Sequence, residues 1–126
     1  MQEEPMNTAV RIEIMTGDKK GKVYSFIGHD TFIFGREADC HCSMPADLEI
    51  SRHHFLMELN PPNARIRDFG SLNGTWVNGK KIGAREKGES PEQGQKRRYP
   101  EVNLKDGDEI RAGKTVLKVM VEIQKK

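Results

Sequence analysis

Residues Asp68-Phe69-Gly70 spell the tripeptide whose aspartate holds magnesium beside the ATP phosphates in protein kinases. A kinase also needs a glycine-rich loop, a lysine in a V-A-I-K strand, an H-R-D catalytic loop and an A-P-E segment. The sequence contains none of these, and its nearest approach, Arg52-His53-His54, lacks the aspartate. A chain of 126 residues is also too short for two kinase lobes. No other set of nucleophile, base and orienting residue stands out, so we predict that the chain is not an enzyme.

A second group of polar residues lies at the ends of hydrophobic runs. Arg36 follows one run, Ser51 and Arg52 precede the next, and Asn73 lies before a third. Arginine makes charge-assisted, often bidentate bonds to phosphate, and serine and asparagine add directional contacts. Taken singly, each residue is as well explained by a solvated or turn position. If the three run ends meet at one edge of the fold, they predict a site that recognises phosphate.

The triplet Cys40-His41-Cys42 raises the question of a metal site. Structural zinc sites usually combine two ligand pairs, with two to four residues between the cysteines. Here one residue separates the cysteines, and the remaining histidines are His29, His53 and His54. We therefore expect two reduced thiols, and no metal or cofactor.

Apolar and polar residues alternate with a period of two around residues 10–14, 55–59, 64–68 and 117–123. Turn signals separate these runs, including Asn73-Gly74 and Asn78-Gly79, pairs that favour tight turns because they tolerate positive φ. Many short strands with frequent turns predict a single all-β domain, an antiparallel sandwich or barrel with no substantial helix. Residues 84–103 interrupt this pattern with charged residues, glycine and proline, and are expected to form a surface loop.

Composition narrows the possible partners and location. The formal net charge is only +2, so we expect no nucleic-acid-binding surface. No apolar run approaches the length of a membrane span, and the acidic start MQEEPMNTAV does not resemble a signal peptide. We therefore expect a cytoplasmic protein without a membrane partner.

Several motifs occur together in a family-specific order. They are Gly35-Arg36, Ser51-Arg52-His53-His54-Phe55, the run from Asp68 to Gly79, and the run from Leu104 to Ile110. Together they resemble the forkhead-associated (FHA) domain, a module that binds phosphothreonine. The resemblance implies a β-sandwich of about eleven strands over residues 9–123, with a long insertion at about 84–103. Residues 1–8 would then be a flexible N-terminus and residues 124–126 a C-terminal tail.

The resemblance also implies a function and a site. The function would be phosphothreonine-dependent binding of partner proteins or peptides in Ser/Thr kinase signalling. Arg36 and Ser51 would bind the phosphate, Arg52 would add a second contact, and Asn73 would hold the peptide main chain. The residues expected to support these loops are Gly35, His54, Gly74, Asn78 and Gly79.

Two features depart from the family pattern. Leu72 stands where several family members have a threonine or serine that touches the phosphate or the peptide, so only its main chain is expected to contribute to the site. The insertion at 84–103 would emerge near the ligand, and we expect it to modulate the choice of peptide.

Other functions remain open on the sequence. An FHA fold that binds its partner independently of phosphorylation is the main alternative. A zinc or nucleic-acid binder would instead use Cys40-His41-Cys42 and Lys96-Arg97-Arg98. Phosphorylation of Ser90, which precedes Pro91, would permit self-association, although nothing else in the sequence indicates it.

Overall fold

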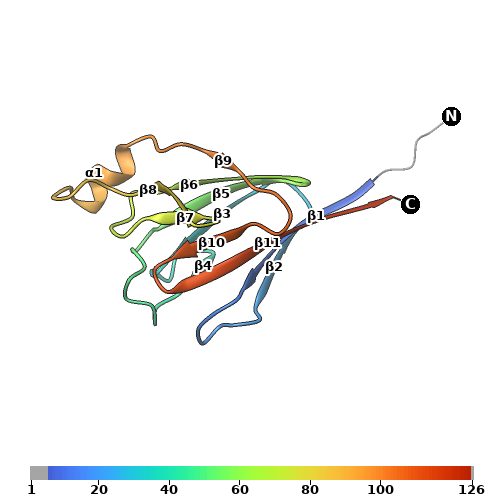
Figure 1. Ribbon diagram of the computed structural model, residues 1–126, viewed down its shortest axis with the longest axis horizontal. Coiled ribbons are helices and arrows are strands. Elements are labelled where there is room, and N and C mark those ends of the chain that lie inside the picture. Colours follow the sequence, from blue (N-terminus) through green and yellow to red (C-terminus); the bar gives the residue numbers. More distant parts are fainter. Residues whose placement is uncertain (1–5, 126) are drawn as a thin grey trace.

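The computed structural model describes residues 6–125, which form two β-sheets packed face to face (Figure 1). The first sheet has the order β2-β1-β11-β10-β7-β8 and the second β4-β3-β5-β6-β9. The first contains β1 (Met6–Ile14), β2 (Val23–Phe26), β7 (Thr75–Val77), β8 (Lys80–Gly83), β10 (Glu109–Ala112) and β11 (Thr115–Lys125). The second contains β3 (Asp30–Gly35), β4 (Cys42–Ser43), β5 (Phe55–Asn60), β6 (Asn63–Asp68) and β9 (Val102–Asn103). The predicted sandwich of about eleven strands is therefore confirmed.

The alternating sequence runs become strands because one face of each sheet is buried against the other. In β5, for example, Phe55, Met57 and Leu59 are fully buried, while Leu56 and Glu58 between them are partly exposed. The core between the sheets is built from such alternate residues of both. Its largest fully buried side chains are Phe32, Phe34, Phe55, Ile12, Ile14, Ile50, Met57, Leu59, Ile66, Ile110, Leu117 and His54.

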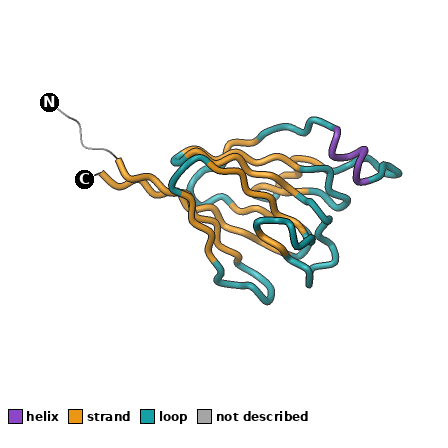
Figure 2. Tube along the Cα trace, turned by 180° about the vertical axis from the view of Figure 1, so that it is seen from behind, coloured by secondary structure: helices purple, strands orange, loops and turns teal. Residues whose placement is uncertain are grey.

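The strand pairing brings distant segments together at one end of the sandwich. The connections after β3, before β5 and after β6 all lie at the end opposite the chain termini (Figures 1 and 2). Because β3 pairs with β5 and β5 with β6, the residues that follow or precede these strands are held at neighbouring positions. The expected meeting of the strand ends at one edge therefore occurs.

Several boundaries differ from those expected. β1 begins at Met6, and Asn7 and Thr8 pair with β11, so part of the expected N-terminal tail belongs to the sheet. β11 extends to Lys125, into the expected C-terminal tail. Residues 1–5 and 126 lie outside the described residues. The pairing is antiparallel except for the short β4, which lies parallel to β3.

The insertion is more ordered than its composition suggested. It contains α1 (Pro91–Lys96), a single short helix, and β9, which pairs with β6. The Ser90 hydroxyl accepts a hydrogen bond from the Gln93 amide, and the Gln93 side chain accepts one from the Ser90 amide. The two reciprocal bonds form a capping box, and proline occupies the first helical position. Both features are local sequence signals for the beginning of a helix. No helix among residues 6–125 is long and apolar enough to span a membrane.

Candidate functional site

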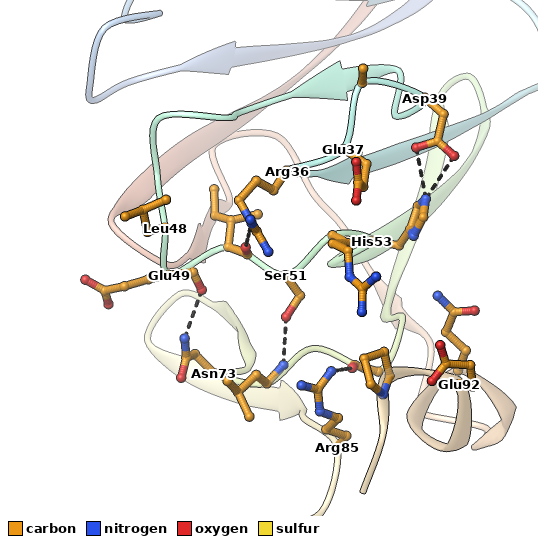
Figure 3. A pocket seen from close by; sticks show the side chains of 17 residues that line it. Arg36, Glu37, Asp39, Leu48, Glu49, Ser51, His53, Asn73, Arg85 and Glu92 are labelled. Atoms are coloured by element: carbon orange, nitrogen blue, oxygen red, sulfur yellow. Dashed lines mark hydrogen bonds and ion pairs between the residues drawn. The ribbon is translucent and has the colours of Figure 1, made fainter.

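A pocket of about 620 Å³ lies between the loops at this end of the sandwich (Figure 3). All five residues predicted to bind a phosphopeptide line it, namely Arg36, Ser51, Arg52, Leu72 and Asn73. The insertion contributes Arg85, Pro91, Glu92 and Gln95 to the same pocket. The five predicted residues and part of the insertion therefore lie at one pocket, and the sequence analysis did not identify which residues of the insertion line it.

Arg36 enters the pocket from the end of β3. Its amide donates to the carbonyl of Ser51 at 3.0 Å, and its Nε donates to the carbonyl of Ile50 at 3.1 Å. These bonds orient the guanidinium, while its two Nη atoms form no hydrogen bond or ion pair within residues 6–125. Two oriented NH2 groups without partners suit a bidentate contact with an anion.

Ser51 presents a hydroxyl proton to the same pocket. Its Oγ accepts a hydrogen bond from the Leu72 amide at 2.9 Å, which fixes the side-chain direction and leaves the hydroxyl hydrogen available (Figure 3). An anion in the pocket is the natural acceptor for this proton. The same bond uses the main-chain donor of Leu72, whose side chain is 58% exposed.

His54 links two of the loops from beneath the pocket. Its Nδ1 accepts from the Ser51 amide at 3.0 Å, and its Nε2 lies 2.8 Å from the Gly74 carbonyl. This pair of partners requires a neutral ring with its proton on Nε2. Burial lowers the pKa of His54, which keeps this neutral form, although the Gly74 carbonyl acts in the opposite direction.

Asn73 connects the third loop to the second. Its Nδ2 donates to the carbonyl of Glu49 at 2.9 Å, which leaves Oδ1 to accept a hydrogen bond. An exposed amide oxygen held in this way suits a main-chain N–H of an extended peptide. The position of Asn73 is thus compatible with the role expected for it.

Asp68 organises the turn that carries Leu72 and Asn73. The buried carboxylate accepts from the amides of Gly70 and Ser71 at 2.8 Å and from the hydroxyls of Ser71 and Thr75. All of these partners belong to the chain itself. The aspartate of the Asp68-Phe69-Gly70 tripeptide therefore acts as the centre of a turn.

The glycines expected to support the site differ in their surroundings. A Cβ at Gly35 would lie 2.2 Å from the carbonyl oxygen of Arg52, so only glycine fits between these loops. Gly74 has a φ of 97° and supplies the carbonyl that faces His54. Asn78 and Gly79 form the β7–β8 turn and do not line the pocket. Asn78 instead bonds Asp108 and the Glu109 amide.

Within residues 6–125, the ligand atoms of Cys40, His41 and Cys42 do not gather in one cluster. His41 Nδ1 accepts a hydrogen bond from the Ile33 amide, and Cys42 is buried in the core. The Cys40 thiol lies close to Asp39 and His53, with the three ligand atoms within 4.8 Å of one another. Burial and the neighbouring Asp39 raise the pKa of Cys40 to about 11.

Comparisons with known proteins agree with this architecture. The FHA-domain family model matches residues 32–91. An FHA domain analysed for phosphothreonine-dependent interactions is 27% identical, with 89% of this chain and 95% of that domain covered at a TM-score of 0.68. The FHA domain of FhaA, in complex with the intracellular domain of Rv3910, is 27% identical, with coverages of 87% and 98% and a TM-score of 0.65.

The kinase-interacting FHA domain of the kinase-associated protein phosphatase from Arabidopsis has a TM-score of 0.75 at 23% identity, with 95% of this chain and 98% of that domain covered. This third likeness concerns the fold alone. No curated protein matches the sequence. The match over residues 32–91 and the shared fold identify this chain as carrying a forkhead-associated (FHA) domain.

Proposed function

We propose that the chain is a phosphothreonine-dependent interaction module, which binds phosphorylated segments of partner proteins in Ser/Thr kinase signalling. The observation that carries the proposal is the convergence of two groups in one pocket: the Arg36 guanidinium, whose Nη atoms have no partner within residues 6–125, and the hydroxyl proton of Ser51. A phosphate dianion can accept hydrogen bonds from both kinds of donor. The related FHA domain analysed for phosphothreonine-dependent interactions supports the choice of ligand.

The contacts of Ser51 favour binding over catalysis. A nucleophilic serine needs a base within hydrogen-bond reach of its hydroxyl. The Nδ1 atom of His54 accepts a hydrogen bond from the Ser51 main-chain amide and is thereby occupied. The Ser51 hydroxyl is held by the Leu72 amide, which donates a proton and cannot take one. FHA domains are interaction modules, and these contacts are in keeping with that role.

We propose that Asn73 binds the main chain of the ligand. Arg52 adds a positive charge at the rim of the pocket. Arg52 is exposed and lines the pocket, so its contribution depends on ionic strength more than that of Arg36. The proposed order of importance is Arg36 and Ser51 first, then Asn73 and Arg52.

A titration with a degenerate phosphothreonine peptide library tests the function. The unphosphorylated and phosphoserine libraries serve as matched ligands, and Arg36→Ala is compared with Arg98→Ala, which removes an exposed arginine outside this pocket. We expect Arg36→Ala to weaken phosphothreonine binding about a hundredfold, because charged hydrogen bonds are lost. Arg98→Ala should bind as the wild type does. Equal retention of all three libraries would instead support a phosphate-independent scaffold.

A further inference from the structure

The insertion is fixed to the turn that carries Leu72 and Asn73. The Arg85 amide donates to the carbonyl of Ser71 at 2.7 Å. Further along, buried Gly94 of α1 packs directly on Gly70, where a Cβ at Gly94 would lie 3.1 Å from the Gly70 oxygen. The start of the insertion and its helix therefore contact the same turn of the pocket.

The Arg85 side chain has fewer partners than its burial requires. One Nη atom donates to the Gly70 carbonyl at 3.3 Å, but the buried Nε has no hydrogen-bond partner among the described residues. A buried donor without a partner is costly, and the cost is greater for a charged group. An anion in the adjoining pocket would supply a counter-charge for this guanidinium.

No carboxylate within residues 6–125 forms an ion pair with Arg85. Glu89 is near enough for the charge of Arg85 to contribute, after the larger effects of Arg97 and the Glu86 amide, to a lowered pKa of Glu89. However, the Glu89 carboxylate is held by Arg97 Nε at 2.9 and 3.0 Å. The charge of Arg85 is thus left without a counterion at the wall of the pocket.

Arg85 and Arg36 approach the pocket from opposite sides of Ser51 (Figure 3). The Leu72 amide is committed to Ser51, and the Leu72 side chain has no donor, so on this side the turn itself offers little to an anion. The guanidinium of Arg85 is anchored to Gly70 and Ser71, directly before Leu72. It lies beside Leu72, which offers no free donor.

We propose that Arg85 is a further phosphate-binding residue, supplied by the insertion on the side of Ser51 opposite Arg36. This inference rests on the proposed function, because it assigns Arg85 to the same phosphate. The insertion then contributes to affinity through a specific charged contact, and its helix acts by holding that contact in place. Loss of Arg85 weakens binding of phosphopeptides specifically.

Titration of a phosphothreonine peptide selected by the wild type tests the inference. Arg85→Ala and Arg85→Lys are measured at two salt concentrations, with Arg36→Ala as the reference for the site. Arg98→Ala is the matched control, because it removes an arginine from the same insertion outside the pocket. We expect Arg85→Ala to weaken binding about tenfold and to reduce the salt dependence of the affinity, with Arg85→Lys intermediate. Arg98→Ala should change neither the affinity nor its salt dependence.

Thermal midpoints of the free proteins separate ligand binding from a purely structural role. If Arg85 only braces the Gly70 carbonyl, Arg85→Ala lowers the midpoint and leaves the salt dependence of binding as in the wild type, which would overturn the inference. Wild-type affinity in Arg85→Ala would also overturn it. After either of these two results, the proposed function would still be supported if Arg36→Ala loses phosphopeptide binding. A wild-type protein that binds no phosphothreonine peptide would remove the proposed function itself.

Discussion

The Asp68 carboxylate accepts four hydrogen bonds in a fully buried position, from two amides and two hydroxyls. A buried charge is tolerated only where such donors replace water. The tripeptide that opens a metal-binding loop in kinases here ends β6 and shapes a tight turn. Whether the aspartate of this tripeptide binds a metal or shapes a turn depends on the surrounding hydrogen-bond donors, which the tripeptide alone does not specify.

We expect Asp68→Asn to lower the free energy of unfolding by about 3 kcal/mol, because a neutral amide brings N–H groups toward donors and weakens the charged hydrogen bonds. Urea denaturation measures the change. Asp18→Asn, at an exposed position, is the control and should stay within about 0.5 kcal/mol of the wild type. Equal stability of the two variants would show that the turn does not depend on the charge of Asp68.

His54 provides a prediction about pH. Burial lowers its pKa from the ordinary value of 6.5, so the unfolded chain binds this proton more readily than the folded one. Stability from the neutral ring is therefore complete above about pH 6.5 and declines as the pH falls toward the lower folded-state pKa. We expect the thermal midpoint to fall between pH 7 and 5.

Titration of the histidine ring signals by NMR identifies the responsible group. His54 should remain neutral well below pH 6.5, with its proton on Nε2, because it accepts from the Ser51 amide and faces the Gly74 carbonyl. A His54 ring that takes up its proton at or above pH 6.5 would contradict the arrangement beneath the pocket.

At the scale of elements, the sequence pattern predicted the long strands but did not identify the two-residue strands β4 and β9. β5 and β6 were recognisable because every second residue is apolar and one face is buried. β4 and β9 have two residues each, too few to show any period, and their positions depend on pairing with β3 and β6. The capping box at Ser90 was a local signal for α1, but composition suggested a loop.

The same distinction applies to the site. That Arg36, Ser51 and Asn73 lie at one pocket was predictable, because each lies beside a strand end in a recognisable motif. Arg85 has no such signal, because its place in the pocket depends on the contact between Gly94 and Gly70, residues 24 positions apart. A contact between such distant residues cannot be predicted from the local alternation of apolar and polar residues.

Gly94→Ala tests whether this contact holds the insertion in place. Helix propensity favours alanine by about 1 kcal/mol, but the new Cβ would lie 2.9 Å from Arg85 Cβ and 3.1 Å from the Gly70 oxygen. We expect the contact to dominate, so that the thermal midpoint falls and phosphopeptide affinity decreases several-fold. Gly28→Ala, whose Cβ would meet no atom within 4 Å, is the control. A more stable Gly94→Ala protein with full affinity would show that the helix is not packed on the turn.

At the scale of the whole molecule, the sandwich separates its core from its site. The paired sheets bury the apolar residues between them, and the loops at one end carry the polar residues of the pocket, opposite the chain termini (Figures 1 and 2). Such a division lets loops vary while the strands hold their ends in place.

The most direct test of the central claim is an NMR titration of the isotopically labelled protein with a phosphothreonine peptide and with its unphosphorylated form. The account predicts that only the phosphorylated peptide shifts the amide signals strongly, and that the largest shifts belong to Ser51, Arg52, Leu72 and Asn73. Equal shifts with both peptides, or shifts confined to the separate pocket around Arg98 and Tyr99, would contradict it.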